Sequence, residues 1–278
     1  MRSTSNPAFR NLPVGGGGYA GFQSAPSSFP GGSYPGTRYS DTQSGYGGAL
    51  PTTGRPMTVD DVVTKTSITL AVLIATGTAT YLSGLWGLAL PAALIGFVLA
   101  LVVIFKKLVS PPLILAYAAV EGVFLGGISG AIGSTVDRYT GGGGSSLVLQ
   151  AITGTVLVFA GMLVVYKTGA VKVTPRLTKW ITGALIGAVG LMLVNLIVGF
   201  FHSGGLGLRD GGPLAIVFSL VVIGIAAFSL LLDFDAADEA IRAGAPEKTA
   251  WYIAFGLTVT LVWLYLEILR LLSYFQSR

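Results

Sequence analysis

From Thr58 to the C-terminus, the sequence alternates long apolar segments with short polar connections. A bilayer core is about 30 Å thick, so a helix that rises about 1.5 Å per residue needs about 20 apolar residues to cross it. Runs of that length predict seven membrane-spanning helices, near residues 62–83, 86–105, 112–133, 147–166, 179–201, 213–233 and 252–275. We therefore expect an all-α membrane protein.

The connections between these segments carry further information. Because only Ser83 to Leu85 separate the first two segments, these should form a tight antiparallel pair. Pro111 and Pro112 open the third segment, and proline is tolerated in the first turn of a helix. Two glycine-rich loops, at residues 141–144 and 204–207, should lie on the same side of the membrane.

Residues 1–57 differ in composition from the rest of the chain. They are rich in Gly, Ser, Tyr and Pro and contain too few branched aliphatic residues to offset the entropy of ordering. The segment also lacks the uninterrupted apolar core of a signal peptide. We expect a disordered tail at 1–57, acting as a solvated tether rather than as a weak contact for partners or lipid. The seven-helix transmembrane domain should then occupy 58–278.

Basic residues in the short loops indicate the orientation. If the tail is cytoplasmic, nine loop Lys and Arg residues lie on that side and four lie on the other. Cytoplasmic loops carry the excess of Lys and Arg, so the N-terminus should be inside and the C-terminus outside. On this basis the net charge of +5 reflects topology and not a surface for nucleic acid. The four external residues are Arg138, Arg209, Arg270 and Arg278.

Composition excludes several classes of function. The chain is 52% hydrophobic, has a mean hydropathy of +0.74 and is 10% charged, whereas soluble domains carry about 25% charge. It has no cysteine, which excludes disulfides and thiolate chemistry. The single histidine, His202, has no acidic partner at the spacing of metal ligands. We expect no cofactor and no catalytic turnover.

Two segments carry isolated polar residues beside regularly spaced glycines. In the third segment, Gly122, Gly126 and Gly130 lie on one face, which allows another helix backbone to approach closely. Glu121 lies beside this face, either as a protonated hydrogen-bonding group or as part of an ion path. The fifth segment repeats the small-residue spacing and carries Asn195, for which an interhelical hydrogen-bond donor is favoured over an ion ligand.

Acidic residues concentrate in the last 50 residues, where the sequence is otherwise apolar. An ionisable group at membrane depth costs about 2.5–3.5 kcal/mol, so it persists where it faces a bundle interior or water. Asp233 follows an unbroken apolar run, and Glu267 has apolar residues on both sides. Both are therefore candidates for function. Asp238, Glu239 and Glu247 are typical of a solvated helix end and connection.

Several of these stretches together resemble the Bax inhibitor-1 family, specifically its bacterial branch. The similar stretches are EGVFLG at 121–126, YKTGAVKVTPR at 166–176, LLDFD at 231–235 and LYLEILRLL at 264–272, within a resemblance that covers about 60–278. The resemblance implies a seven-helix fold with the last helix surrounded by the other six, in a bacterial cytoplasmic membrane. It also implies a proton-sensitive calcium leak governed by one acid on helix six and one on helix seven.

By this resemblance, the helix-seven acid is Glu267, and the helix-six acid is Asp233 or Asp235. Two carboxylates within hydrogen-bond reach titrate as a unit, and when both are ionised they offer a hard oxygen site for transient Ca²⁺. The family pattern has two aspartates, whereas this chain has a glutamate on helix seven. If helix seven begins near Trp251, Glu267 lies about 24 Å along it. The pair then meets only if helix six extends, helix seven starts late, or the helices are displaced.

Three functions follow from these observations. The favoured one is a pH-sensitive calcium or cation leak. The alternative is a non-conducting membrane regulator that binds other membrane proteins, such as a membrane-bound ATP-dependent protease, a role implied by the same resemblance. An intramembrane hydrolase is third, because the acid spacing does not resemble that of aspartyl membrane proteases.

Overall fold

The computed structural model describes residues 55–106, 109–201 and 205–276. The predicted tail before Arg55 and the single histidine, His202, lie outside the described residues. Within them, seven helices are long and apolar enough to cross a membrane, as the hydrophobic pattern predicts. They are α1 (Val59–Ser83), α2 (Ala89–Lys106), α3 (Pro111–Thr140), α4 (Gly144–Thr168), α5 (Pro175–Phe201), α6 (Pro213–Arg242) and α7 (Thr249–Gln276), with a short 3₁₀ turn, η2 (Trp86–Leu88), before α2.

Local sequence signals set most of the helix ends. Thr58 begins α1 with a capping box, in which its hydroxyl accepts from the Asp61 amide and the Asp61 carboxylate accepts from the Thr58 amide. Gly84 ends the same helix in the left-handed conformation that glycine adopts without strain. The last turns of α6 extend nine residues beyond the apolar run, to Arg242, because the sequence AADEAIR is made largely of good helix formers.

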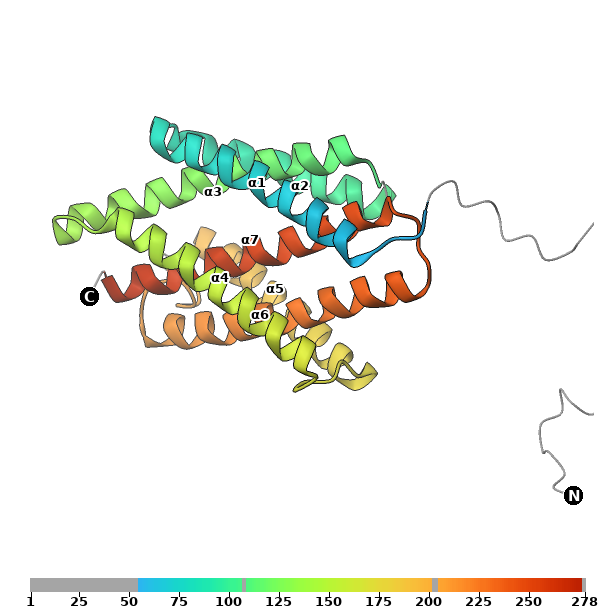
Figure 1. Cartoon of the computed structure of the whole chain (residues 1–278). Coiled ribbons are helices and arrows are strands. Elements are labelled where there is room, and N and C mark those ends of the chain that lie inside the picture. The colour runs from blue at the N-terminus through green and yellow to red at the C-terminus, as the bar shows by residue number, and fades with distance from the viewer. Residues whose placement is uncertain (1–54, 107–108, 202–204, 277–278) are drawn as a thin grey trace, which may run out of the picture. The chain divides into compact units, whose positions relative to one another are not determined.

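The last helix, α7, runs through the centre of the bundle (Figure 1). It packs against α1, α3, α4 and α6, and most of its length is buried. The remaining two helices lie further out. Helix α2 packs on α3 and reaches α7 through a small apolar cluster that contains Val103, Tyr117 and Phe255. Helix α5 packs on α6, so α7 is central but has four helices, not six, as its main neighbours.

Helices α1 and α3 form the closest pair, as the glycine spacing of α3 predicts. A methyl group at Gly122 would overlap the Thr76 hydroxyl and the Leu73 carbonyl of α1, and one at Gly126 would overlap the Gly77 carbonyl. The similar glycines on α5 behave differently. Nothing in the described part of the chain lies within 4 Å of a methyl group placed at Gly183 or Gly187. That face of α5 is therefore open.

The folded domain begins a few residues earlier than the composition predicts. Pro56 forms an antiparallel bridge with Pro246, and the Met57 amide donates to the Ala245 carbonyl over 2.8 Å. The side chain of Met57 is 2% exposed. Residues 55–57 thus belong to the packed domain, because they pair with the α6–α7 connection instead of with solvent.

Charged side chains reinforce the same junction. Arg55 donates two hydrogen bonds to Asp61, of 2.8 and 2.6 Å, and this contact raises the pKa of Arg55. Lys65 donates to Glu247 over 3.0 Å, and Arg55 lies 3.4 Å from the same carboxylate. The interpretation of Glu247 as a simply solvated residue is therefore wrong, because it is an ion-pair partner of two basic residues.

Candidate functional site

Glu267 is the most deeply buried acidic side chain in the described part of the chain, with 2% of its surface exposed. It lies on α7, close to the end of the bundle that holds the α5–α6 loop. Its Oε1 accepts from Arg270 over 2.8 Å and from Arg209 over 3.3 Å. The other oxygen, Oε2, is buried and has no hydrogen-bond partner among the described residues. Two positive charges thus surround one carboxylate, and half of its accepting capacity is unused.

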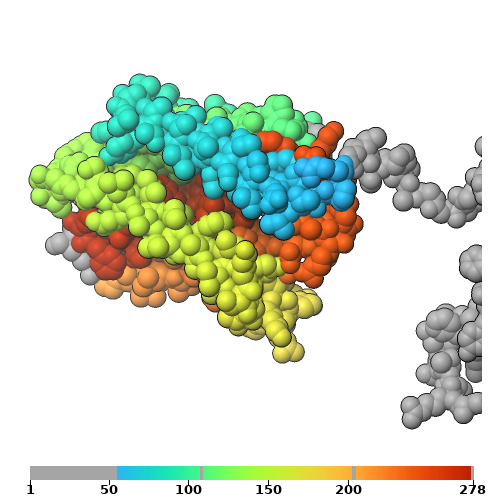
Figure 2. All heavy atoms as spheres, viewed as in Figure 1, coloured from blue at the N-terminus to red at the C-terminus, as the bar shows by residue number. Residues whose placement is uncertain are grey.

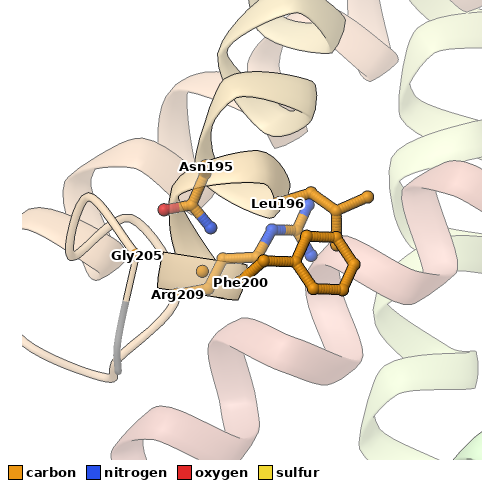
Figure 3. A pocket seen from close by; sticks show the side chains of 6 residues that line it. Asn195, Leu196, Phe200, Gly205 and Arg209 are labelled. Carbon is orange, nitrogen blue, oxygen red and sulfur yellow. The ribbon is translucent and has the colours of Figure 1, made fainter. Parts of the chain in front are cut away.

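Arg209 reaches Glu267 from the loop between α5 and α6. This loop is anchored by Asn195, whose side-chain oxygen accepts from the Leu206 amide over 2.8 Å. Figure 3 shows the Arg209 side chain next to Phe200 and Leu196, at a cavity of about 320 Å³ that Asn195 also lines. Burial lowers the pKa of Arg209, and the neighbouring Arg270 lowers it further, whereas Glu267 acts in the opposite direction. Glu267 is therefore the group that compensates the charge of Arg209.

Asp233 on α6 contacts the same central helix at a different level. Its Oδ2 accepts from the Thr260 hydroxyl on α7 over 2.7 Å. The Thr260 hydroxyl also lies 3.3 Å from the Gly256 carbonyl one turn earlier. The side chain of Asp233 is partly buried, at the interface of α6 and α7. The aspartate that ends the apolar run thus faces the bundle centre, as the sequence predicts.

The two acids stand in series along α7. Thr260 and Glu267 are seven residues apart, which places them about 20° apart around the helix and about 10 Å apart along it. Asp233, which contacts Thr260, and Glu267 therefore lie along the same face of α7 but make no direct contact. In the described part of the chain, no three acidic or histidine side chains are close enough together to hold a metal ion. The expected calcium site of Asp233, Asp235 and Glu267 is not formed, because α6 extends only nine residues past Asp233 while Glu267 lies eighteen residues into α7.

The other acids of α6 make different contacts. Asp238 accepts from the Tyr166 hydroxyl of α4 over 3.1 Å and from Arg242 over 2.8 Å. Asp235 has no hydrogen-bond or ion-pair partner among the described residues and is partly exposed. Of the two aspartates considered from the sequence, Asp233 is thus the one that contacts α7. The separation of Asp233 and Glu267 also differs from a hydrolytic dyad, in which two carboxylates lie about 3 Å apart and share a proton.

Glu121 lies elsewhere in the bundle, between α3 and α2. It is 9% exposed, and its Oε2 has no hydrogen-bond partner among the described residues. Gly96 of α2 leaves room for the carboxyl group, since a methyl group there would lie 3.0 Å from Oε1. Glu121 is therefore not part of the α6–α7 face, and its role in an ion path stays a prediction.

The contacts of Asn195, Arg209 and Arg270 differ from those that the sequence suggests. Within the described residues, Asn195 accepts from a loop amide and donates no interhelical hydrogen bond, because it lies in the last two turns of α5 where the chain folds back. The sequence marks Arg209 and Arg270 only as topology signals, yet both pair with Glu267. The position of Arg270, three residues after Glu267, is a signal for an intrahelical pair. Arg209 has no such signal, because a loop sets its position.

A comparison with protein families gives a match over nearly the whole chain. Residues 6–277 match the family described as Bax inhibitor 1 like. A search among curated proteins finds no match.

Proposed function

Because this chain belongs to the Bax inhibitor 1 like family, we propose that it is a proton-modulated cation leak with calcium as its cargo. It acts in the bacterial cytoplasmic membrane, with its N-terminus in the cytoplasm and without catalytic turnover. The observation that carries the proposal is Glu267, a carboxylate 2% exposed on the central helix. A charge at that depth is costly, by about 2.5–3.5 kcal/mol, and is typical of ion pathways.

The path follows the face of α7 that Thr260 and Glu267 share. Asp233 supplies a carboxylate at one level and Glu267 supplies one about 10 Å further along. Carboxylate and hydroxyl oxygens are the ligands that Ca²⁺ prefers. A dehydrated cation can therefore move between two sites, each with one acid, without being held by a cage of several carboxylates. Weak single-acid sites favour passage over retention, since conduction requires binding that also allows release.

Arg209 and Arg270 close this path at the Glu267 level. Their guanidinium groups donate hydrogen bonds to Oε1 of Glu267, and their positive charges repel an approaching cation. Each of the two ion pairs depends on the negative charge of the Glu267 carboxylate. Arg209 is on a loop, so it is the partner that is free to leave. Departure of Arg209 from Glu267 should therefore open the leak.

The test is calcium entry into proteoliposomes that contain only this protein, measured with an enclosed dye over a series of pH values. Glu267→Gln removes a cation site and leaves Arg209 and Arg270 uncompensated, so it should lower flux. Arg209→Gln removes the loop guanidinium that closes the path, so it should raise flux. A coupling free energy of about 1–3 kcal/mol corresponds to an increase of about 5- to 150-fold. Asp233→Asn should lower flux, because it removes the carboxylate that attracts the cation.

Asp235→Asn is the matched control, since it makes the same change two residues away on α6, at a side chain that does not contact α7. Its flux should equal that of the wild type. The double variant of Glu267 and Arg209 should have the low flux of Glu267→Gln, because opening the path cannot compensate for the lost cation site. If Glu267→Gln, Arg209→Gln and Asp233→Asn all keep wild-type flux and pH dependence, the leak proposal is wrong.

A specific observation also favours the alternative, a membrane regulator that binds other membrane proteins such as a membrane-bound ATP-dependent protease. The face of α5 with Gly183 and Gly187 is open, and such small-residue faces promote close helix packing in membranes. Gly187→Leu should prevent a partner helix from docking without disturbing the bundle. Loss of a co-purifying membrane partner in this variant, together with unchanged flux, would support the regulator instead of the leak.

A further inference from the structure

A second cavity, of about 700 Å³, lies between α1, α4 and α6. It is separate from the Glu267 site and starts at the end of the bundle where α1 begins and where α4 and α6 end. Figure 2 looks onto this face, with α1 and α4 diverging toward that end. Its lining is largely apolar and includes Leu70, Phe159, Phe234 and Leu257. Pockets of about 300–1,000 Å³ are typical of small-molecule sites.

The mouth of this cavity is basic. Lys167, in the last turn of α4, and Lys172, in the connection that follows, both line it. Gly169 ends α4 with φ +67°, and the chain then folds back so that Val171 and Val173 also line the cavity. Neither lysine has an ion-pair partner among the described residues. The one carboxylate in the lining, Asp238, is paired with Arg242, so the charges of the two lysines are not compensated.

We propose that this cavity binds one anionic phospholipid, with an acyl chain between α1, α4 and α6 and the phosphate at Lys167 and Lys172. An acyl chain gains nothing by moving from the bilayer into an equally apolar pocket. Selectivity must therefore come from the headgroup, and basic clusters at the ends of transmembrane helices attract anionic lipid headgroups. The proposal does not depend on the leak, because none of these residues belongs to the Glu267 site.

Thr66 adds an independent sign that the cavity takes a polar ligand. It lines the cavity and is 7% exposed, and its hydroxyl has no hydrogen-bond partner among the described residues. Other buried threonines of the bundle, such as Thr69 and Thr258, donate to the carbonyl four residues earlier. The Thr66 oxygen is covered in its present rotamer, but a helical threonine populates two χ1 rotamers. Rotation lets the hydroxyl donate to a lipid ester carbonyl below the headgroup.

Native mass spectrometry of the full chain in detergent tests the charge selection. Phosphatidylglycerol is the probe, and phosphatidylcholine is the zwitterionic comparison. Each lysine near an anionic headgroup contributes about fivefold in affinity, so Lys167→Gln with Lys172→Gln should weaken phosphatidylglycerol binding about 25-fold and leave phosphatidylcholine binding unchanged. The control double variant, Lys106→Gln with Lys179→Gln, removes the same charge at lysines outside the cavity. It should stay within about twofold of the wild type on this additive estimate.

Photolabelling tests whether the acyl chain enters the cavity. A phosphatidylglycerol with a photoreactive group near the end of one chain should label Leu70 or Phe159 in the wild type, and this label should disappear in the Lys167/Lys172 variant. Equal losses in the two double variants would show general surface attraction and overturn the proposal. Labelling confined to α5 would overturn it too, since the lipid would then lie on the outer face. Full competition by inorganic phosphate alone would identify a phosphate site without a lipid and would also overturn it.

Discussion

Gly126 on α3 offers a direct test of how the bundle is held together. In Gly126→Ala, the new methyl group would overlap the Gly77 carbonyl of α1 and would lie 2.9 Å from the Thr80 Cβ. Both neighbours are backbone or branch-point atoms that cannot rotate away. The two helices must therefore separate or the variant must lose contacts along α1 and α3, which form the most extensive helix pair in the described structure.

The expected cost follows from these contacts. Inserting a methyl group into a packed interface costs about 1–3 kcal/mol, and a rigid backbone neighbour favours the upper end of that range. Alanine is also a better helix former than glycine by about 1 kcal/mol. The free energy of unfolding should therefore fall by about 2 kcal/mol, the difference between a cost of about 3 and a gain of about 1.

Gly187→Ala on α5 is the matched control, because nothing in the described part of the chain lies within 4 Å of its methyl group. It should keep the gain in helix propensity and carry no packing cost. Unfolding in mixed micelles with increasing dodecyl sulfate, followed by circular dichroism, gives both free energies. Their difference should be about 3 kcal/mol. Equal changes in the two variants would refute the close α1–α3 packing.

Four further predictions concern other parts of the chain. Deleting residues 2–54 should leave the unfolding free energy nearly unchanged, and a large loss would show that the tail packs on the bundle. Arg55→Gln should destabilise the domain slightly, since it removes a two-bond contact with a carboxylate at a solvent-screened surface junction; unfolding in mixed micelles measures it. A cysteine at 143 should react only with an external reagent and one at 172 only with a cytoplasmic one, by the basic-residue bias. Glu121→Gln should fold normally, and failure to assemble would indicate an ionised, paired glutamate.

The seven helices were predictable because each apolar run is long enough for a bilayer, and length is a property of the local sequence. The end of α6 was not predictable, since the apolar run stops at Asp233 while the helix continues to Arg242. Past that point the helix is half solvated and acidic, and its sequence cannot be distinguished from a polar loop by hydropathy alone. The start of the domain at Arg55 was missed for a related reason, because its contacts are with residues almost 200 positions away.

Glycine spacing predicted one interface and not another. Gly122 and Gly126 allow α3 to approach α1 closely, whereas Gly183 and Gly187 have the same spacing and no neighbour within the described chain. Regular glycine spacing gives a helix a face without protruding side chains. Which partner covers it depends on the order of helices around α7, which no local pattern contains.

The candidate site was also predictable only in part. Glu267 and Asp233 were recognisable because an acid among apolar residues is costly at membrane depth and is retained there mainly where it contacts a polar partner or water. The distance between the two acids could not be predicted, because it depends on the register between α6 and α7, which the connection at 243–248 sets. Arg209 could not be predicted as a partner, since its position follows from the fold of a loop and from the Asn195 contact within it.

The central position of α7 has a consequence for the order of assembly during synthesis. Helix α7, which α1, α3, α4 and α6 all contact, is synthesised after these four helices, so their inner faces stay uncovered until it emerges. The inner face of α3 includes Ser129, whose hydroxyl shares a 2.6 Å hydrogen bond with Tyr265 of α7. Nascent chains without α7 should therefore stay loosely associated and open to proteolysis. The bundle should become compact in one late step, when the final helix enters.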